Sequence, residues 1–259
     1  NYEKIEKLAR VMTDLQNQGK EMILVSSGAG AAGVGRLGLK EKPSDLPGKQ
    51  ACAAVGQGIL MNIYERLFAE YSQVVAQVLL TRIDTIDRHR YSNSRNTFQE
   101  LIKWGVIPIV NENDVVAVDE MKIGDNDNMS ALVASMADAD LDILLSDIDG
   151  LYTANPKTHP DAQMVHEVEK VTPEIEATAG GVGSKNATGG MLTKLQAAKT
   201  AMSSGIYLII ASGEDPEILR KIVRGDEVGT LFVPRENHLR FRNQWLAFGE
   251  SIGVPVSVL

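Results

Sequence analysis

The sequence predicts an α/β protein, a three-layer αβα sandwich with a mainly parallel central sheet. Short apolar runs alternate along the chain with helical segments of ten or more residues. Such alternation predicts parallel strands joined by right-handed crossovers. One run, "VIPIV" at 106–110, has no polar position. A strand of this kind is typical of a parallel sheet that helices cover on both faces.

The composition supports a packed α/β core and excludes several classes of protein. The chain has 259 residues, of which 44% are hydrophobic, so a sizeable core can form. The net charge is −8 and no basic block occurs, which argues against nucleic-acid binding. No apolar run approaches the ~18–20 residues of a membrane span. Cys52 is the single cysteine, so we expect a buried thiol in a reducing, cytoplasmic compartment.

The elements follow from the apolar periodicity, taken in chain order. The amphipathic pattern at 3–18 predicts a helix that ends at Gly19. In the first half, further strands are expected at 22–25, 73–80 and 106–110, with helices at 49–70 and 88–104. In the second half, we expect a small hairpin at 115–123, helices at 128–137, 190–203 and 215–224, and strands at 142–146, 206–211 and 229–233. The strands are expected to share one sheet.

Ligands of parallel sheets bind at the carboxyl ends of the strands, so the loops there are candidate sites. The segment 26–35, "SSGAGAAGVG", contains four glycines, three alanines and two serines after a strand. Small residues would let a helix pack closely on the sheet, or exposed backbone N–H groups would hold an anion. Both explanations stay open. The segment also fits the dinucleotide pattern G-x-G-x-x-G, but lacks the acidic partner ~20 residues further on, at the end of a second strand.

Two further loops carry polar or glycine-rich sequences. "NEND" at 111–114 and "GDNDN" at 124–128 would converge on one place and bind an ammonium group or a lysine, although turn chemistry is an alternative. "GGVGSKNATGGMLTK" at 180–194 precedes a helix and would hold a phosphate, with Lys194 one turn into the helix. A flexible loop with an ordinary lysine is the other explanation. The four histidines are scattered, and we expect no metal site in the protein.

Seven stretches together resemble the amino acid kinase family, in particular its members that act on glutamate. They are "LVSSGAGAAG", "KQACAAVGQ", "NENDVVA", "GDNDNMSALVA", "LLSDIDGLYTANP", "TGGMLTK" and "VGTLF", in the family's order over nearly the whole chain. The resemblance implies ATP-dependent phosphorylation of the γ-carboxylate of L-glutamate to glutamyl 5-phosphate, the first step of proline biosynthesis, with ATP and Mg²⁺. It implies one domain over 1–259, with an acceptor lobe at about 1–140 and a nucleotide lobe at about 141–245.

The resemblance also implies roles for residues at the matching positions. The catalytic residues would be Lys194, at the transferred phosphoryl group, and Asp127, which would orient lysines. Glutamate would contact Ser27, Gly28, Asp114 and Asn126. The nucleotide would contact Ser146, Asp147, Thr188, Gly189, Gly190, Met191, Leu192, Thr193 and Lys194. This set fits the chemistry, because an ionised carboxylate needs no base and the protein has mainly to position two anions and neutralise their charge.

The sequence departs from the family at three places. The family begins with a strand and a Lys-x-Gly-[Ser/Thr] loop, whereas this sequence begins with a helix. We therefore expect that the sheet lacks a member here and that the natural polypeptide extends upstream by a strand with a second lysine. Ala187 replaces a glycine, and the tail 250–259 matches nothing in the family's pattern. Many bacterial members carry a further C-terminal domain of RNA-binding type.

Other readings remain open at this point. One alternative is another kinase of the family, acting on acetylglutamate, aspartate or uridylate. A second is the kinase half of a bifunctional synthase. A non-catalytic nucleotide-binding module is a candidate from a different class. The family further suggests a homo-oligomer, a dimer or tetramer, and inhibition by proline, with neither nucleic acid nor membrane as partner.

Overall fold

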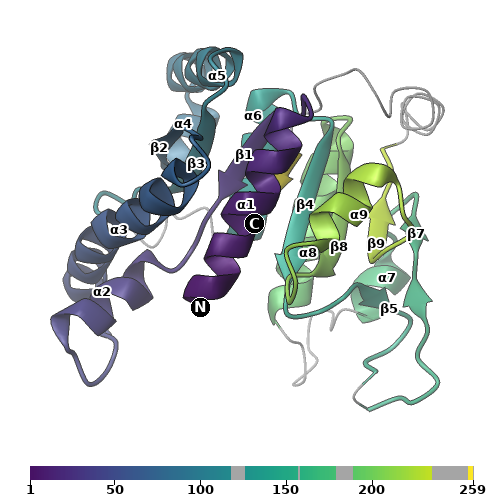
Figure 1. Cartoon of the computed structure of the whole chain (residues 1–259). Coiled ribbons are helices and arrows are strands. Elements are labelled where there is room, and N and C mark those ends of the chain that lie inside the picture. Colours follow the sequence, from purple (N-terminus) through teal and green to yellow (C-terminus); the bar gives the residue numbers. More distant parts are fainter. Residues whose placement is uncertain (118–125, 157, 179–188, 235–255, 259) are drawn as a thin grey trace.

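The structure is a computed structural model that describes residues 1–117, 126–156, 158–178, 189–234 and 256–258. Helices cover both faces of a central sheet (Figure 1). The predicted three-layer αβα sandwich is thus confirmed. No helix in the described part of the chain has the length and apolarity that crossing a bilayer requires.

One eight-stranded sheet runs through both halves of the chain. Its order is β2 (Val75–Leu80), β3 (Ile107–Glu112), β1 (Met22–Val25), β10 (Val256–Val258), β4 (Leu141–Ser146), β8 (Tyr207–Ser212), β9 (Thr230–Phe232) and β7 (Glu167–Val168). All neighbours pair in parallel except β8 and β9, which are antiparallel. A separate antiparallel pair joins β5 (Leu151–Tyr152) to β6 (Met164–Val165). The mainly parallel sheet matches the expectation from the sequence.

The helices divide between the two faces of the sheet according to the side-chain alternation of the strands. In β4, Leu141 and Ile143 join the core beneath α1 (Tyr2–Asn17), α3 (Leu46–Ala69) and α9 (Ile218–Arg224). Leu144 points to the opposite face, where α6 (Asn126–Ala137) and α8 (Gly189–Ser203) pack. The helix α5 (Arg88–Lys103) packs on the same face as α6, through Phe98. Burying each such side chain stabilises the fold by about 1.5–3 kcal/mol.

The glycine-rich segment after β1 is the main correction to the predicted elements. Residues from Ala29 on form the helix α2 (Ala29–Leu37) and not a loop. A Cβ atom on Gly33 would lie 1.8 Å from the carbonyl oxygen of Cys52, and one on Gly56 would lie 1.7 Å from that of Ala29. Hence α2 and α3 pack with their backbones in contact. The structural explanation for the small residues holds for this helix.

Smaller differences concern the ends of elements and short segments. The helix expected at 49–70 begins at Leu46, because Asp45 caps it by accepting a hydrogen bond from the N–H of Gly48 at 2.9 Å. The helix expected at 215–224 begins at Ile218. The sequence did not predict α4 (Arg82–Ile86), α7 (Pro173–Thr178), β5, β6 or β7. Most of the hairpin expected at 115–123 lies outside the described residues.

The strand β10 lies between β1 and β4, at the centre of the sheet. Its backbone pairs in parallel with both neighbours, Val256 opposite Met22 on one side and opposite Leu141 on the other. The sequence did not predict this strand, and its presence does not decide whether the sheet lacks a further member. The expectation of an upstream strand with a second lysine is a separate question and stays a prediction.

Candidate active site

A cavity of about 640 Å³ opens at the carboxyl ends of β1, β4 and β8. Its walls come from the first turns of α1, from α3 and from the loop between β8 and α9. Three residues that the sequence singled out line it: Ser27, Ser146 and Asp147. The cavity thus lies where a parallel α/β sheet is expected to bind its ligands.

The end of β1 is held in the cavity wall by polar contacts from two helices. The Ser26 hydroxyl lies 2.8 Å from the hydroxyl of Tyr64, which comes from α3 and also lines the cavity. The carbonyl oxygen of Ser26 accepts a hydrogen bond from Nδ2 of Asn126 at 2.9 Å. Burial raises the pKa of Tyr64 above its usual value. These contacts fix the backbone that leads to Ser27.

Gly28 ends this segment with a backbone conformation that other residues adopt at a cost. Its φ is +100°, in the left-handed region, and it is the N-cap of α2. The carbonyl oxygen of Gly28 accepts the first helical hydrogen bond, from the N–H of Ala32 at 2.9 Å. Glycine is therefore required here by the turn from β1 into α2, and it leaves Ser27 exposed on the cavity wall.

The two residues expected to be catalytic form an ion pair between α6 and α8. Nζ of Lys194 lies 3.1 Å and 2.9 Å from the two carboxylate oxygens of Asp127. The Thr193 hydroxyl donates to the same carboxylate at 2.9 Å. Both charged side chains are nearly buried, with exposures of 12% for Lys194 and 13% for Asp127. Asp127 lies in the first turn of α6, where the helix dipole favours a negative charge.

A fully buried carboxyl group lies near this ion pair. Asp142, in β4, accepts a hydrogen bond at Oδ1 from the Ser130 hydroxyl at 2.5 Å. Its Oδ2 has no hydrogen-bond partner among the described residues. Burial raises the pKa of Asp142 to about 7, the Ser130 hydrogen bond acts in the opposite direction, and the charge of Asp127 raises it further. The group is thus coupled to the charge that holds Lys194.

The predicted nucleotide residues fall into two groups. Ser146 and Asp147 end β4, where the Ser146 hydroxyl donates to Asp147 at 3.0 Å. The N–H of Gly213 donates to the carbonyl oxygen of Ser146 at 2.6 Å, which ties the β8–α9 loop to this end of β4. The remaining members begin α8. They are Gly189, Gly190, Met191, Leu192, Thr193 and Lys194. Thr188 lies outside the described residues.

Not all expected site residues meet in one place. The described residues of the cavity wall do not include Asp114, Asn126, Asp127 or Lys194. Asn126 reaches the cavity only through its bond to Ser26, and Asp114 lies half-buried in the turn after β3. Met191 packs against the core between α6 and α8, which gives it a packing role. Among the described residues, no three His, Cys, Asp or Glu side chains form a group that could hold a metal ion.

Sequence reasoning missed two polar residues of this region, Tyr64 and Asp142. Tyr64 lies in the long helix α3, where the sequence carries no motif that marks it as a polar contact of the site. Asp142 opens the apolar run "DILLS", a pattern that predicts only a strand. A carboxylate inside such a run was the available signal, because Asp is rarely fully buried.

Comparisons with known proteins bear on the family of the chain. The family model described as "Amino acid kinase family" matches residues 1–212. The glutamate 5-kinase of Moorella thermoacetica is 53% identical over 258 residues, which cover 100% of this chain and 68% of that protein. The glutamate 5-kinase of Clostridium acetobutylicum is 54% identical over 235 residues, 91% of this chain and 88% of that protein.

Solved structures of more distant proteins share the fold. Carbamate kinase from Giardia lamblia bound to AMP-PNP superposes with a TM-score of 0.63 at 17% identity and covers 90% of each chain. The isopentenyl phosphate kinase product complex from T. acidophilum has a TM-score of 0.58 at 18% identity, covering 89% of this chain and 90% of the other. At these identities the likeness concerns the fold alone.

Proposed function

The chain belongs to the amino acid kinase family, and we propose that it transfers the γ-phosphoryl group of ATP to the γ-carboxylate of L-glutamate. This is the glutamate 5-kinase reaction, a phosphoryl transfer to a carboxyl acceptor and the first step of proline biosynthesis. The proposal rests mainly on 53% identity to the Moorella thermoacetica glutamate 5-kinase over 100% of the chain. The buried Lys194–Asp127 pair supports it independently, since it offers a positioned cation without a catalytic base.

The chemistry assigns Lys194 to charge neutralisation. A γ-carboxylate oxygen of glutamate forms a bond to the γ-phosphorus of ATP, the bond to the β–γ bridging oxygen breaks, and ADP leaves with that electron pair. Charge accumulates on the transferred group, so a fixed ammonium stabilises the transition state. Asp127 and Thr193 hold the Lys194 amine by hydrogen bonds, which fixes its position before the reaction.

The two substrates would approach from different strand ends. Glutamate would bind at the end of β1, next to Ser27 and Gly28, with Asp114 pairing with its ammonium group. Asn126 would act through the Ser26 carbonyl that it holds. ATP would bind from the side of Ser146 and the first turns of α8. This assigns the segment to about 140 to the acceptor and the segment from about 141 to 245 to the nucleotide.

Mg²⁺ would arrive with ATP and neutralise phosphate charge when bound. It usually keeps several waters and takes one or two carboxylates together with phosphate oxygens. Asp147, an exposed carboxylate on the cavity wall, fits that requirement. The proposal also includes a homo-oligomer, inhibition by proline and a cytoplasmic location, where ATP and glutamate are available. The family resemblance is the support for these three points.

Hydroxamate formation tests the proposal directly. The protein is incubated with ATP, Mg²⁺, hydroxylamine and one acceptor, because hydroxylamine traps an acyl phosphate as a hydroxamate, which gives a coloured complex with Fe(III). We expect a product with L-glutamate and none without ATP. Aspartate and acetylglutamate serve as competing acceptors, and ADP release reports on uridylate. A faster reaction with one of these would assign the chain to another activity of the family, and ATP binding without any turnover would favour a non-catalytic module.

A further inference from the structure

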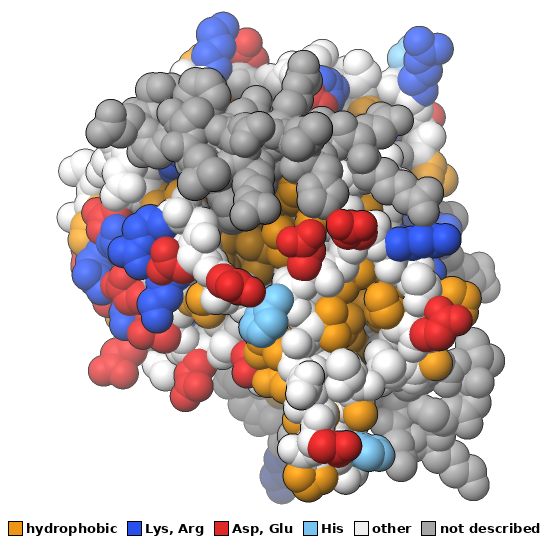
Figure 2. Space-filling model, turned by 90° about the vertical axis from the view of Figure 1, so that its right-hand side faces the viewer, with side chains coloured by type: hydrophobic (Ala, Val, Ile, Leu, Met, Phe, Trp, Pro, Cys, Tyr) orange, Lys and Arg blue, Asp and Glu red, His pale blue; other side chains and the backbone are white. Residues whose placement is uncertain are grey.

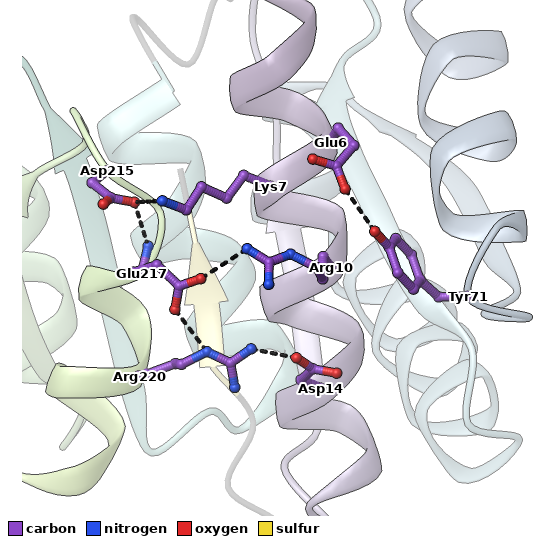
Figure 3. A network of polar contacts seen from close by, with 8 residues as sticks. All are labelled: Glu6, Lys7, Arg10, Asp14, Tyr71, Asp215, Glu217 and Arg220. Carbon is purple, nitrogen blue, oxygen red and sulfur yellow. Dashed lines mark hydrogen bonds and ion pairs between the residues drawn. The ribbon is translucent and has the colours of Figure 1, made fainter.

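Six charged side chains form a network between α1 and the start of α9, here called the α1–α9 ion cluster (Figure 3). Lys7 Nζ lies 2.8 Å from Asp215 Oδ1, and Arg10 Nη2 lies 3.0 Å from Glu217 Oε1. Arg220 contacts Glu217 through Nε at 2.8 Å and Asp14 through Nη2. The members are Lys7, Arg10, Asp14, Asp215, Glu217 and Arg220. Three cations face three carboxylates, so the cluster as a whole attracts neither sign of ligand.

The cluster links two segments that line the cavity, α1 and the β8–α9 loop. On one side, Lys4 and Leu8 of α1 line the cavity, and on the other side the β8–α9 loop lines it with Gly213, Glu214 and Pro216. Lys7 and Asp215 belong to these same two segments. The ion pair between them therefore sets the separation of the two walls.

Asp215 also organises the loop that carries it. The carboxylate that pairs with Lys7 accepts a hydrogen bond from the N–H of Glu217 at 3.0 Å, at the N-cap of α9. At the other end of the loop, Gly213 is bound to the carbonyl oxygen of Ser146. A movement of Asp215 is thus transmitted to a loop that touches a predicted nucleotide residue.

Apolar packing holds both helices on the sheet. Met12 and Leu15 of α1 and Leu219 and Ile222 of α9 are buried in one common core. The charged side chains are 28–58% exposed. Basic and acidic side chains lie interspersed on this flank, at the left of Figure 2. Apolar burial is non-directional, whereas ion pairs fix which atoms lie opposite each other.

We propose that the α1–α9 ion cluster positions the β8–α9 loop for the nucleotide, with Lys7 and Asp215 as its key positioning residues. The proposal rests on the proposed kinase function. It concerns ATP and not glutamate, because the loop follows β8 and is bound to Ser146. The residues proposed to bind the substrate glutamate instead lie at the end of β1 and beyond. An exposed ion pair of this kind contributes at most about 1 kcal/mol, which corresponds to roughly fivefold in affinity.

The test compares Asp215→Asn, Lys7→Met and the double variant in the full chain. Asparagine keeps an oxygen for the N–H of Glu217 and removes only the charge. We expect each single variant to raise KM for ATP by about three- to fivefold, with kcat and KM for glutamate unchanged. The double variant should be no worse than either single variant, because both remove the same interaction. Lys7→Arg should retain most of the affinity, and 0.5 M KCl should shrink the difference from the unchanged protein.

Arg224→Met is the matched control. It removes an ion pair of the same length, 2.8 Å to Asp226, from the opposite end of α9. Equal increases in both KM values, additive effects in the double variant, or the same increase in Arg224→Met would overturn the proposal. If the unchanged protein makes no acyl phosphate, the proposed function fails instead. Calorimetric binding of AMP-PNP to the same variants then decides the role of the cluster separately.

Discussion

The ion pairs on the two faces of the sheet differ in their exposure to solvent. On the α6–α8 face, Lys194 and Asp127 are only 12% and 13% exposed. On the α1–α9 face, the ion-cluster side chains are 28–58% exposed. Water screens an exposed pair and leaves it about 0–1 kcal/mol, whereas a charge removed from water interacts more strongly with whatever lies near it. The nearly buried pair is therefore suited to stabilising charge during phosphoryl transfer. The exposed cluster is suited to positioning the β8–α9 loop in the cavity wall.

The α6–α8 face buries a carboxylate oxygen without a described partner, whereas on the α1–α9 face the described atom of this kind is the neutral hydroxyl of Thr13. Asp142 is completely buried and its Oδ2 has no partner among the described residues. Leaving one buried oxygen unsatisfied costs about 1–3 kcal/mol. On the α1–α9 face each carboxylate of the ion cluster faces a cation and water. If burial is what separates the two faces, removing a charge should have large effects on the first and small effects on the second.

Replacing Lys194 should have the largest effect. Lys194→Ala removes the ammonium that would face the transferred group and leaves Asp127 buried without its cation, so we expect kcat to fall by roughly 10²-fold or more. Lys194→Arg should not restore it fully, because a planar guanidinium replaces a compact ammonium. The measurement is ADP release at saturating ATP and glutamate.

Lys199→Ala provides the control for this substitution. Lys199 lies on the same helix and pairs with Glu176 at the surface. Its loss should leave kcat within about twofold, as expected for an exposed pair. A nearly normal kcat in Lys194→Ala would remove this residue from the mechanism and would break the contrast between the two faces.

Asp142 should make stability depend on pH. Its pKa in the folded protein is raised to about 7, against an ordinary value of 3.8. Between these two values the folded state binds more protons than the unfolded state, so the free energy of unfolding falls as the pH rises from about 4 and levels off above about 7. The double variant Asp142→Leu with Ser130→Ala replaces both partners by apolar groups. We expect it to be more stable than the unchanged protein by about 1–3 kcal/mol at pH 8, and by less at pH 5.

Thermal unfolding of both proteins at pH 5 and pH 8 measures this difference. Ser130→Ala alone removes the hydrogen bond that favours the ionised carboxylate and should lower the stability most at pH 8. If the double variant is less stable than the unchanged protein at pH 8, the buried carboxylate has a partner that outweighs its desolvation.

Most of the fold could be predicted because hydrophobic periodicity follows directly from burial. The strand 22–25 was predicted to the residue, and the run 106–110 lies within one residue of the start of β3. The sequence did not predict the helix α2, because three of its nine residues are glycines, which have a low helix propensity. Only the close contact with α3 explains why small residues form a helix here. The two-residue strands β5, β6 and β7 carry too few residues for any periodicity.

The candidate site was predictable where a residue lies at a strand end. Ser27, Ser146 and Asp147 follow directly from the positions of β1 and β4. The Lys194–Asp127 pair joins residues that are 67 positions apart, so family resemblance and not local pattern brought them together. Tyr64 could not be identified, because its partner Ser26 is defined only by tertiary packing. Asp142 left a signal as a carboxylate in an apolar run, but its partner Ser130 is likewise defined only by packing.

Asp114 tests the acceptor side at intermediate burial. Asp114→Asn removes the charge that would pair with the ammonium group of glutamate, while the amide keeps an oxygen for the turn. We expect KM for glutamate to rise about tenfold, as for a charged hydrogen bond, and KM for ATP to stay within about twofold. Initial rates at varied concentrations of each substrate separate the two constants. A loss of thermal stability without any change in KM would instead assign Asp114 to turn chemistry.

Tyr64 gives the smallest effect and decides whether burial or the face of the sheet matters. It lies on the α1–α9 face, next to the cavity, but is only 6% exposed. Tyr64→Phe keeps the ring packed and removes the hydrogen bond to Ser26, which is a neutral bond worth about 0.5–1.5 kcal/mol. We expect KM for glutamate to rise about two- to fivefold, because the Ser26–Ser27 backbone loses one of its anchors, with kcat unchanged. Tyr71→Phe is the control, since it removes a 2.6 Å hydrogen bond to Glu6 that is only partly buried and does not line the cavity, so both KM values should stay unchanged. If the two substitutions change KM alike, burial does not determine the effect of polar contacts on this face. The difference expected between Lys194 and the ion cluster would then have to rest on charge alone.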